Sequence, residues 1–130
     1  MSNHYTKHNV EFHEYYMHKY VYDLHIVNVP AIISYDRLNK ILIMEKINNM
    51  NISDMYGEKA CNINEELFGK IRSIIKTLYN YNIGYPDITG YNFIEYDGKV
   101  WIIDFEHSYK IDPFITKFIK GANIWNPEYE

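Results

Sequence analysis

The chain has 130 residues, of which 47% are hydrophobic and 23% are charged, and its formal net charge is −4. This composition is typical of one globular domain and excludes an intrinsically disordered chain, which needs low hydrophobicity and high net charge. The negative charge gives no electrostatic reason to expect a nucleic-acid partner, and no apolar run reaches the roughly 18 residues of a membrane span. A single cysteine and a polar start without a signal-peptide core favour a cytoplasmic protein.

The first half of the chain predicts a helix followed by a β-hairpin. We expect the polar residues 1–9 to be disordered and residues 10–130 to form a single domain. Over residues 10–25, apolar side chains recur at spacings of three and four, which predicts a helix with one apolar stripe: Tyr16, Met17, Tyr20, Val21 and Leu24. Residues 30–34 and 41–45 are rich in β-branched and aliphatic residues around a polar turn, which predicts a hairpin.

The second half repeats this order. Residues 65–81 carry an apolar face with charges opposite, and Asn64 is a suitable N-cap, so we predict the longest helix here. Asp97-Gly98 between two apolar runs predicts a second hairpin, and residues 111–119 predict a final helix that begins near Pro113. Hairpins in place of crossovers indicate an α+β fold with antiparallel strand pairs.

Three polar residues around the second hairpin suit phosphoryl-transfer chemistry. Asp87 lies five residues before Asn92, and Asp104 follows twelve residues later at the end of an apolar strand. Because the hairpin folds the chain back, Asn92 and Asp104 should meet near its open end, where two oxygen ligands suit Mg²⁺. Asp87, one loop away, could accept a proton from a hydroxyl. Each residue also admits a structural explanation, as a turn aspartate, a strand cap and a hydrogen-bonded aspartate respectively.

This pattern resembles the catalytic core of the protein-kinase-like phosphotransferases, whose catalytic loop has an aspartate, four residues and then an asparagine. The resemblance implies that Asp87 is the catalytic-loop aspartate and that Asn92 and Asp104 hold Mg²⁺ beside ATP. It also implies that Phe105 and Glu106, which follow Asp104, contribute to the cofactor site. The form with glutamate at this third position is similar to choline-kinase-like and aminoglycoside-kinase-like enzymes as well.

Upstream segments extend the resemblance to roughly residues 10–108. Residues 41–47 look like the strand and hinge that hold adenine in the family. Met44 would guard the back of the pocket, and Glu45, Lys46 and Ile47 would present backbone groups to the base. Glu14 stands where the family has the glutamate of its lysine–glutamate ion pair, with Glu11 as the alternative.

The sequence also departs from the family pattern. It has no glycine among its first ten residues, so it offers no glycine-rich loop there, and Lys7 lies in a polar stretch without the pattern of a strand lysine. Glu14 is therefore expected to lack a partner. Tyr85 replaces the histidine of the family's loop. We accordingly expect a minimal kinase-like core that lacks most of the N-terminal sheet.

These observations leave three hypotheses. The first is a truncated kinase-like protein that binds ATP and Mg²⁺ and transfers phosphate, weakly if at all, to a protein serine or threonine or to a small molecule. The second is a non-catalytic pseudokinase that acts as an interaction or regulatory module, and the third is a structural protein in which the motif is coincidental. We expect a second copy or another protein to pair with the exposed hairpin edge. AT-rich codon usage suggests a large DNA virus or a compact parasite genome, and hence host cytoplasm.

Overall fold

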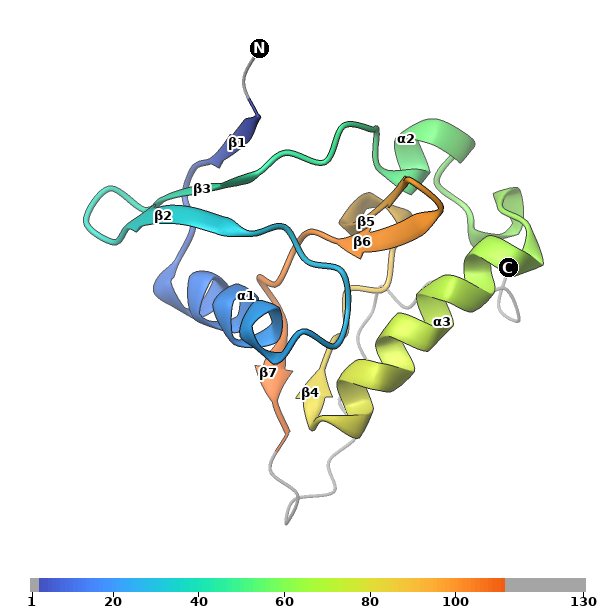
Figure 1. Cartoon of the computed structure of the whole chain (residues 1–130). Coiled ribbons are helices and arrows are strands. Elements are labelled where there is room, and N and C mark those ends of the chain that lie inside the picture. Colours follow the sequence, from blue (N-terminus) through green and yellow to red (C-terminus); the bar gives the residue numbers. More distant parts are fainter. Residues whose placement is uncertain (1–2, 112–130) are drawn as a thin grey trace.

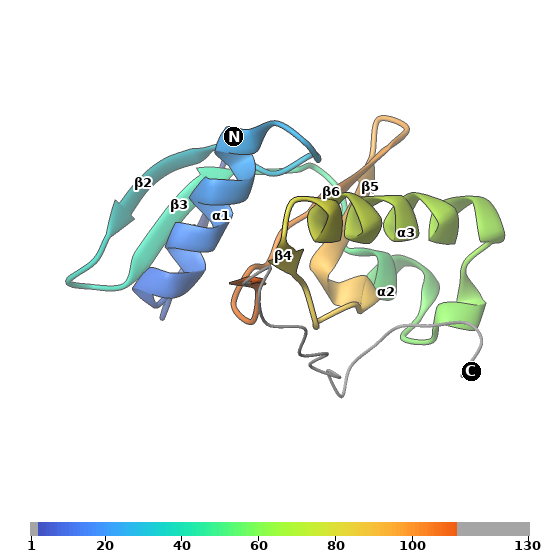
Figure 2. The same ribbon diagram turned by 90° about the horizontal axis from the view of Figure 1, so that it is seen from below.

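The computed structural model describes residues 3–111 and confirms an α+β architecture (Figure 1). A three-stranded sheet and the helix beside it form one part of the molecule, and the longest helix with two short two-stranded sheets forms the other (Figure 2). The elements are β1 (His4–Lys7), α1 (Phe12–Leu24), β2 (Ile32–Asp36), β3 (Ile41–Glu45), α2 (Ile52–Tyr56), α3 (Glu65–Asn80), β4 (Ile83–Gly84), β5 (Phe93–Tyr96), β6 (Lys99–Ile102) and β7 (Tyr109–Lys110), with 3₁₀ turns at Ala60–Asn62 and Gly90–Asn92.

The expectation that residues 1–9 are disordered is wrong for the described part of this segment. His4–Lys7 form β1, which pairs antiparallel with β3 and gives the sheet order β1-β3-β2. Val10 follows the strand and is fully buried, in contact with the apolar side of β3. The polar composition of β1 gave no local signal, because its order comes from pairing with a distant strand. The predicted hairpin is therefore part of a three-stranded sheet, since β1 covers one of its edges.

The first helix is confirmed, but the face that it buries is turned from the predicted stripe. Its buried residues are Glu14, Met17, His18 and Val21, whereas Tyr16 is 40% exposed. The helix ends at Leu24, and the following C-cap residue, His25, adopts a left-handed conformation with φ 53°. A glutamate and a histidine on the buried face are unexpected, because polar side chains are buried at a cost unless they are paired or hydrogen-bonded.

The second half of the molecule follows the sequence pattern closely. Asn64 caps α3 by accepting a 2.8 Å hydrogen bond from the amide of Leu67, and the apolar face of this helix is buried in the main core. Asp97 and Gly98 both have positive φ, as a tight hairpin turn between β5 and β6 requires. The predicted final helix at residues 111–119 lies outside the described residues, apart from Ile111.

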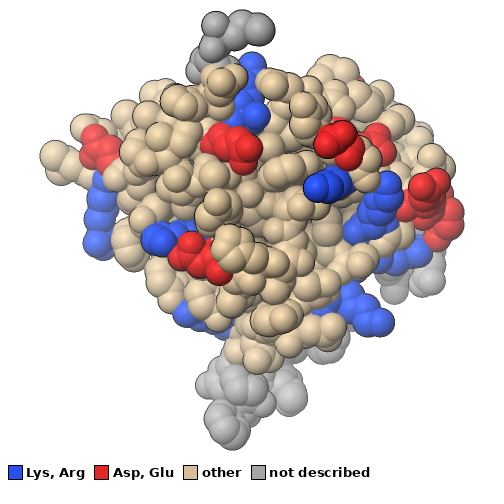
Figure 3. Space-filling view, viewed as in Figure 1, with Lys and Arg blue, Asp and Glu red and all other residues tan. Residues whose placement is uncertain are grey.

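Two general properties of the described residues complete the fold. No helix among them combines the length and the apolar character needed to cross a bilayer. On the face seen in Figure 3, the described acidic and basic side chains are interspersed rather than gathered into a patch of one sign.

Candidate active site

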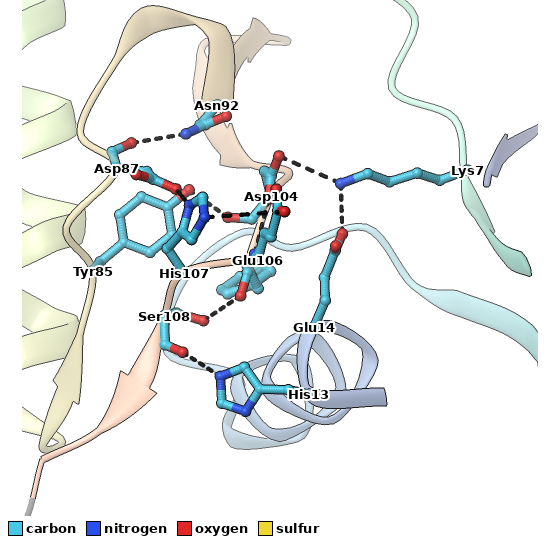
Figure 4. A network of polar contacts seen from close by, with 11 residues as sticks. Lys7, His13, Glu14, Tyr85, Asp87, Asn92, Asp104, Glu106, His107 and Ser108 are labelled. Atoms are coloured by element: carbon cyan, nitrogen blue, oxygen red, sulfur yellow. Dashed lines mark hydrogen bonds and ion pairs between the residues drawn. The ribbon is translucent and has the colours of Figure 1, made fainter. Parts of the chain in front are cut away.

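Lys7 occupies the centre of the candidate site. Pairing of β1 with β3 places its ammonium 2.5 Å from a carboxylate oxygen of Glu14 on α1 and 3.4 Å from one of Asp104 beyond β6 (Figure 4). The Glu14 side chain is only 6% exposed. Two expectations are thereby corrected: a strand lysine upstream of Glu14 is present, and Glu14 has a partner. Lys7 was not recognised as this lysine because it belongs to a strand that is stabilised only by its pairing with β3.

The charges around Lys7 keep it protonated. Burial favours the neutral amine, but the carboxylates of Asp104 and Glu14 outweigh that effect and raise the pKa of Lys7 above its ordinary value. A partly buried lysine with two carboxylate neighbours is thus a fixed positive charge. It faces the space where the sheet, α1 and the segment after β6 meet.

Asp104 is held by its backbone as well as by its side chain. The buried Tyr85 hydroxyl donates a hydrogen bond to the backbone carbonyl of Asp104, and the Glu106 amide donates to its carboxylate at 2.9 Å. Tyr85 replaces the histidine expected from the family pattern, and its burial raises its pKa well above the ordinary value. It therefore acts as a neutral donor. Phe105 is fully buried and packs on Tyr85 and on the His18 ring of α1.

The loop after β4 carries Asp87 and Asn92. The Asn92 side-chain amide donates to the backbone carbonyl of Asp87 at 2.8 Å, while the Asn92 carbonyl accepts from the amide of Ile103 at 3.0 Å. The hairpin thus brings the loop and Asp104 to one end, as the sequence predicts. The Asp87 carboxylate also forms a hydrogen bond with Nδ1 of His107, and this bond raises the pKa of the imidazole. His107 was not among the site residues predicted from the sequence.

A cavity of about 410 Å³ opens beside this cluster. Lys7 and Asp104 line it together with the four residues expected at the hinge: Met44, Glu45, Lys46 and Ile47. Met44 is buried against the small apolar cluster below the sheet. The amides of Glu45 and Lys46 already donate to the carbonyls of Ala31 and Asn3, so these two N–H groups are engaged within the protein. The volume lies within the range of typical small-molecule sites.

The part of the sequence that forms the fold and this site matches a known family. The model of the RIO domain matches residues 2–115. The chain belongs to the RIO domain family. A search of curated proteins found no match. RIO domains belong to the atypical protein-kinase-like superfamily, which confirms the kinase-like fold, and the family is one of kinase-like phosphotransferases that generally use ATP and Mg²⁺.

The donor set of this RIO domain fits a hard divalent cation. One carboxylate oxygen each from Glu14, Asp104 and Glu106 lies within 4.8 Å of the others. Mg²⁺ takes oxygen ligands and retains waters and phosphate oxygens, so it needs only one or two carboxylates from the protein. Glu14 is paired with Lys7, and of the three carboxylates only that of Asp104 belongs to a residue lining the cavity, so Asp104 is the one best placed to hold a cation there. Asn92 lies across the same hairpin end.

Proposed function

We propose that this RIO domain binds ATP with Mg²⁺ in the cavity and transfers the γ-phosphoryl group to a hydroxyl. The observation that carries the proposal is the position of the Lys7 ammonium, between Glu14 and Asp104 on the wall of the cavity. A cation fixed at this point can contact phosphate oxygens, while the hinge residues line the same cavity. Phosphoryl transfer depends mainly on positioning and electrostatic stabilisation, which are what such an arrangement supplies.

The residues then have separate roles. Glu14 orients Lys7 toward the phosphates, and Asp104, with Asn92, would hold Mg²⁺, which neutralises charge on the phosphate oxygens when bound. Asp87 accepts the proton of the acceptor hydroxyl as its oxygen bonds to phosphorus and the bond to ADP breaks. The acceptor is a protein serine or threonine or the hydroxyl of a small molecule.

We propose further that transfer is slow. All six glycines of the sequence lie at or after Gly57, so no glycine-rich loop lies among the described strands of the three-stranded sheet. Loss of one backbone or side-chain donor to a developing charge costs on the order of 10²–10³-fold in rate in well-studied enzymes. Binding is less dependent on that loop, because the lysine and the hinge side of the cavity are in place.

The test is a thermal melt with ATP in the presence and absence of Mg²⁺. A ligand that binds only the folded state stabilises by about 2.7 kcal/mol at a hundredfold excess over its dissociation constant. We expect a rise of several degrees in the melting temperature that depends on Mg²⁺ and is lost in Lys7→Met and Asp104→Asn. Lys19→Met is the matched control, because Lys19 forms an exposed pair with Asp23 away from the cavity. No shift in the wild type would contradict the proposal.

A further inference from the structure

The contact between His107 and Asp87 joins the catalytic loop to the segment that follows Asp104. His107 Nδ1 lies within hydrogen-bond distance of a carboxylate oxygen of Asp87, as Figure 4 shows. Since a carboxylate only accepts, Nδ1 must carry the hydrogen. The imidazole is 59% exposed while the Asp87 side chain is 22% exposed. The ring therefore lies on the solvent side of the carboxylate, where an acceptor would approach.

The backbone of His107 is fixed by its neighbour. Ser108 is 1% exposed, and its amide and hydroxyl both donate to the carbonyl of Phe105, at 3.2 and 2.7 Å. The Ser108 carbonyl lies 2.6 Å from Nε2 of His13 on α1, which can donate to it. These bonds hold the turn that presents His107, so the imidazole reaches Asp87 from an anchored position.

We propose that His107 is a positioning residue that holds one carboxylate oxygen of Asp87 and leaves the other facing the acceptor hydroxyl. The inference rests on the proposed function, because it assigns the role of Asp87 in transfer. Asn92 holds the backbone of Asp87 and His107 holds its side chain, so the carboxylate is restrained at two points. A proton acceptor fixed in orientation loses less entropy when the transition state forms.

This role predicts an effect on turnover and none on nucleotide binding. His107 is not among the residues that line the cavity, whereas Lys7, Asp104 and the hinge residues are. Removing the imidazole should lower kcat and leave both KM for ATP and the ATP-induced rise in melting temperature unchanged. A residue needed only for the fold would change the melting temperature without ligand and would not separate kcat from KM in this way.

The experiment uses three substitutions that differ in where they place a donor. His107→Asn puts an amide near the position of Nδ1, His107→Gln puts it near Nε2, and His107→Ala removes it. ADP release is measured with Mg²⁺ and ATP, with water as the acceptor. We expect kcat to fall roughly tenfold in the alanine and glutamine variants, less than the ~100-fold that a 1 Å misplacement can cost. His107→Asn should restore most of the rate, and His25→Asn, at the exposed end of α1, is the matched control.

A second measurement tests the contact between His107 and Asp87 without requiring turnover. Long-range ¹H–¹⁵N correlation spectra at a fixed alkaline pH distinguish the two neutral tautomers of an imidazole. We expect the Nδ1–H form for His107 in the wild type and the ordinary Nε2–H form in Asp87→Ala. The Nε2–H form in the wild type would overturn the inference.

The outcomes separate the two proposals. A wild type that turns over ATP while all three His107 variants match its kcat would overturn the role of His107 and leave the proposed function standing. A wild type that shows neither a Mg²⁺-dependent rise in melting temperature with ATP nor release of ADP would overturn the proposed function and, with it, this role of His107. The inference would also be contradicted if His107→Asn restored kcat no better than His107→Gln, because the inference requires a donor at the position of Nδ1.

Discussion

His18 is a titratable residue in the core of the molecule and lies beside the active-site segment. Its side chain is 1% exposed, its Nε2 lies 2.8 Å from the carbonyl of Pro30, and its ring packs on Phe105 with centroids 5.2 Å apart. Burial lowers the pKa of His18 below the ordinary value of 6.5, and the nearby charges of Lys7 and Asp104 act in opposite directions. The folded protein therefore holds a neutral imidazole against Phe105.

This predicts a loss of stability on mild acidification. As the pH falls below about 6.5, the unfolded chain takes up a proton at His18 that the folded chain refuses, so the stability present above this pH is lost toward the lower folded pKa. The slope from one such group is at most about 1.4 kcal/mol per pH unit. His18→Met should lower the stability at neutral pH, through the lost hydrogen bond, and flatten its dependence on pH. Urea titrations of both proteins across this range measure the two effects.

His107 changes the pH dependence of stability in the opposite direction to His18. Its hydrogen bond to Asp87 raises its pKa, so its contribution is present at low pH and is lost as the pH rises through the folded value. Because the imidazole is largely exposed, solvent screens this contribution.

The prediction for His18 would be contradicted if the free energy of unfolding of the wild type and of His18→Met changed with pH by the same slope on the acid side of neutrality.

At the level of elements, α3 depends on a local signal at its first turn. Asn64 accepts from the amide of Leu67 and satisfies a donor that has no partner within the helix. We expect Asn64→Ala to lower the free energy of unfolding by about 1 kcal/mol. Ser73→Ala, on the exposed face of the same helix, should change it little. Urea unfolding of both variants gives the comparison, and equal stabilities would show that the cap contributes nothing.

The elements that the sequence predicts correctly are those with local signals. The cap at Asn64, the apolar period of α3 and the Asp97-Gly98 turn each act within a few residues, so they could be recognised without knowledge of the fold. The offsets from Asp87 to Asn92 and Asp104 are of the same kind, because one hairpin brings these residues together. The family match confirms the resemblance that they indicated.

Other features depend on contacts between distant residues. β1 is polar and four residues long, and only its pairing with β3 makes it a strand, so neither the strand nor the role of Lys7 could be recognised locally. The buried face of α1 was misjudged for the same reason, since Glu14 is buried only because Lys7 arrives from another element. His107 was missed because its partner, Asp87, lies twenty residues earlier.

At the scale of the whole molecule, the cavity is lined by both parts, with Lys7 and Met44 from the three-stranded sheet and Ile94 and Asp104 from the part that contains α3. The small cluster of Val10, Leu42 and Met44 supports the sheet, and the larger one surrounds α3. The two parts are joined near Asn28, whose carbonyl accepts from the amide of Ile102 at 3.0 Å and whose side chain donates to the carbonyl of Val100. Met44 to Ile47 and Asp104, which line the same cavity, are therefore contributed by different parts. Association with a second copy or another protein through the outer edge of the sheet stays a prediction.

The position of Lys7 on an outer strand links nucleotide affinity to local opening of the chain. Among the described strands, β1 lies at the edge of its sheet and pairs with β3 alone. Edge segments of this kind detach at a lower free-energy cost than global unfolding. If ATP contacts Lys7 as proposed, it binds the state in which β1 is attached, so binding lowers the fraction of molecules in which β1 is detached. We expect ATP with Mg²⁺ to slow hydrogen–deuterium exchange of the β1 amides more than that of the β5–β6 hairpin. Equal slowing in both would contradict this linkage.

The same equilibrium works in the reverse direction. If the strand is attached for only a fraction of the time, the apparent dissociation constant for ATP rises by the inverse of that fraction. Substitutions at Tyr5 or Thr6, which change how long the strand stays paired, would then alter affinity. If ATP contacts Lys7 as proposed, the free energy of pairing this one short strand forms part of the free energy of ATP binding.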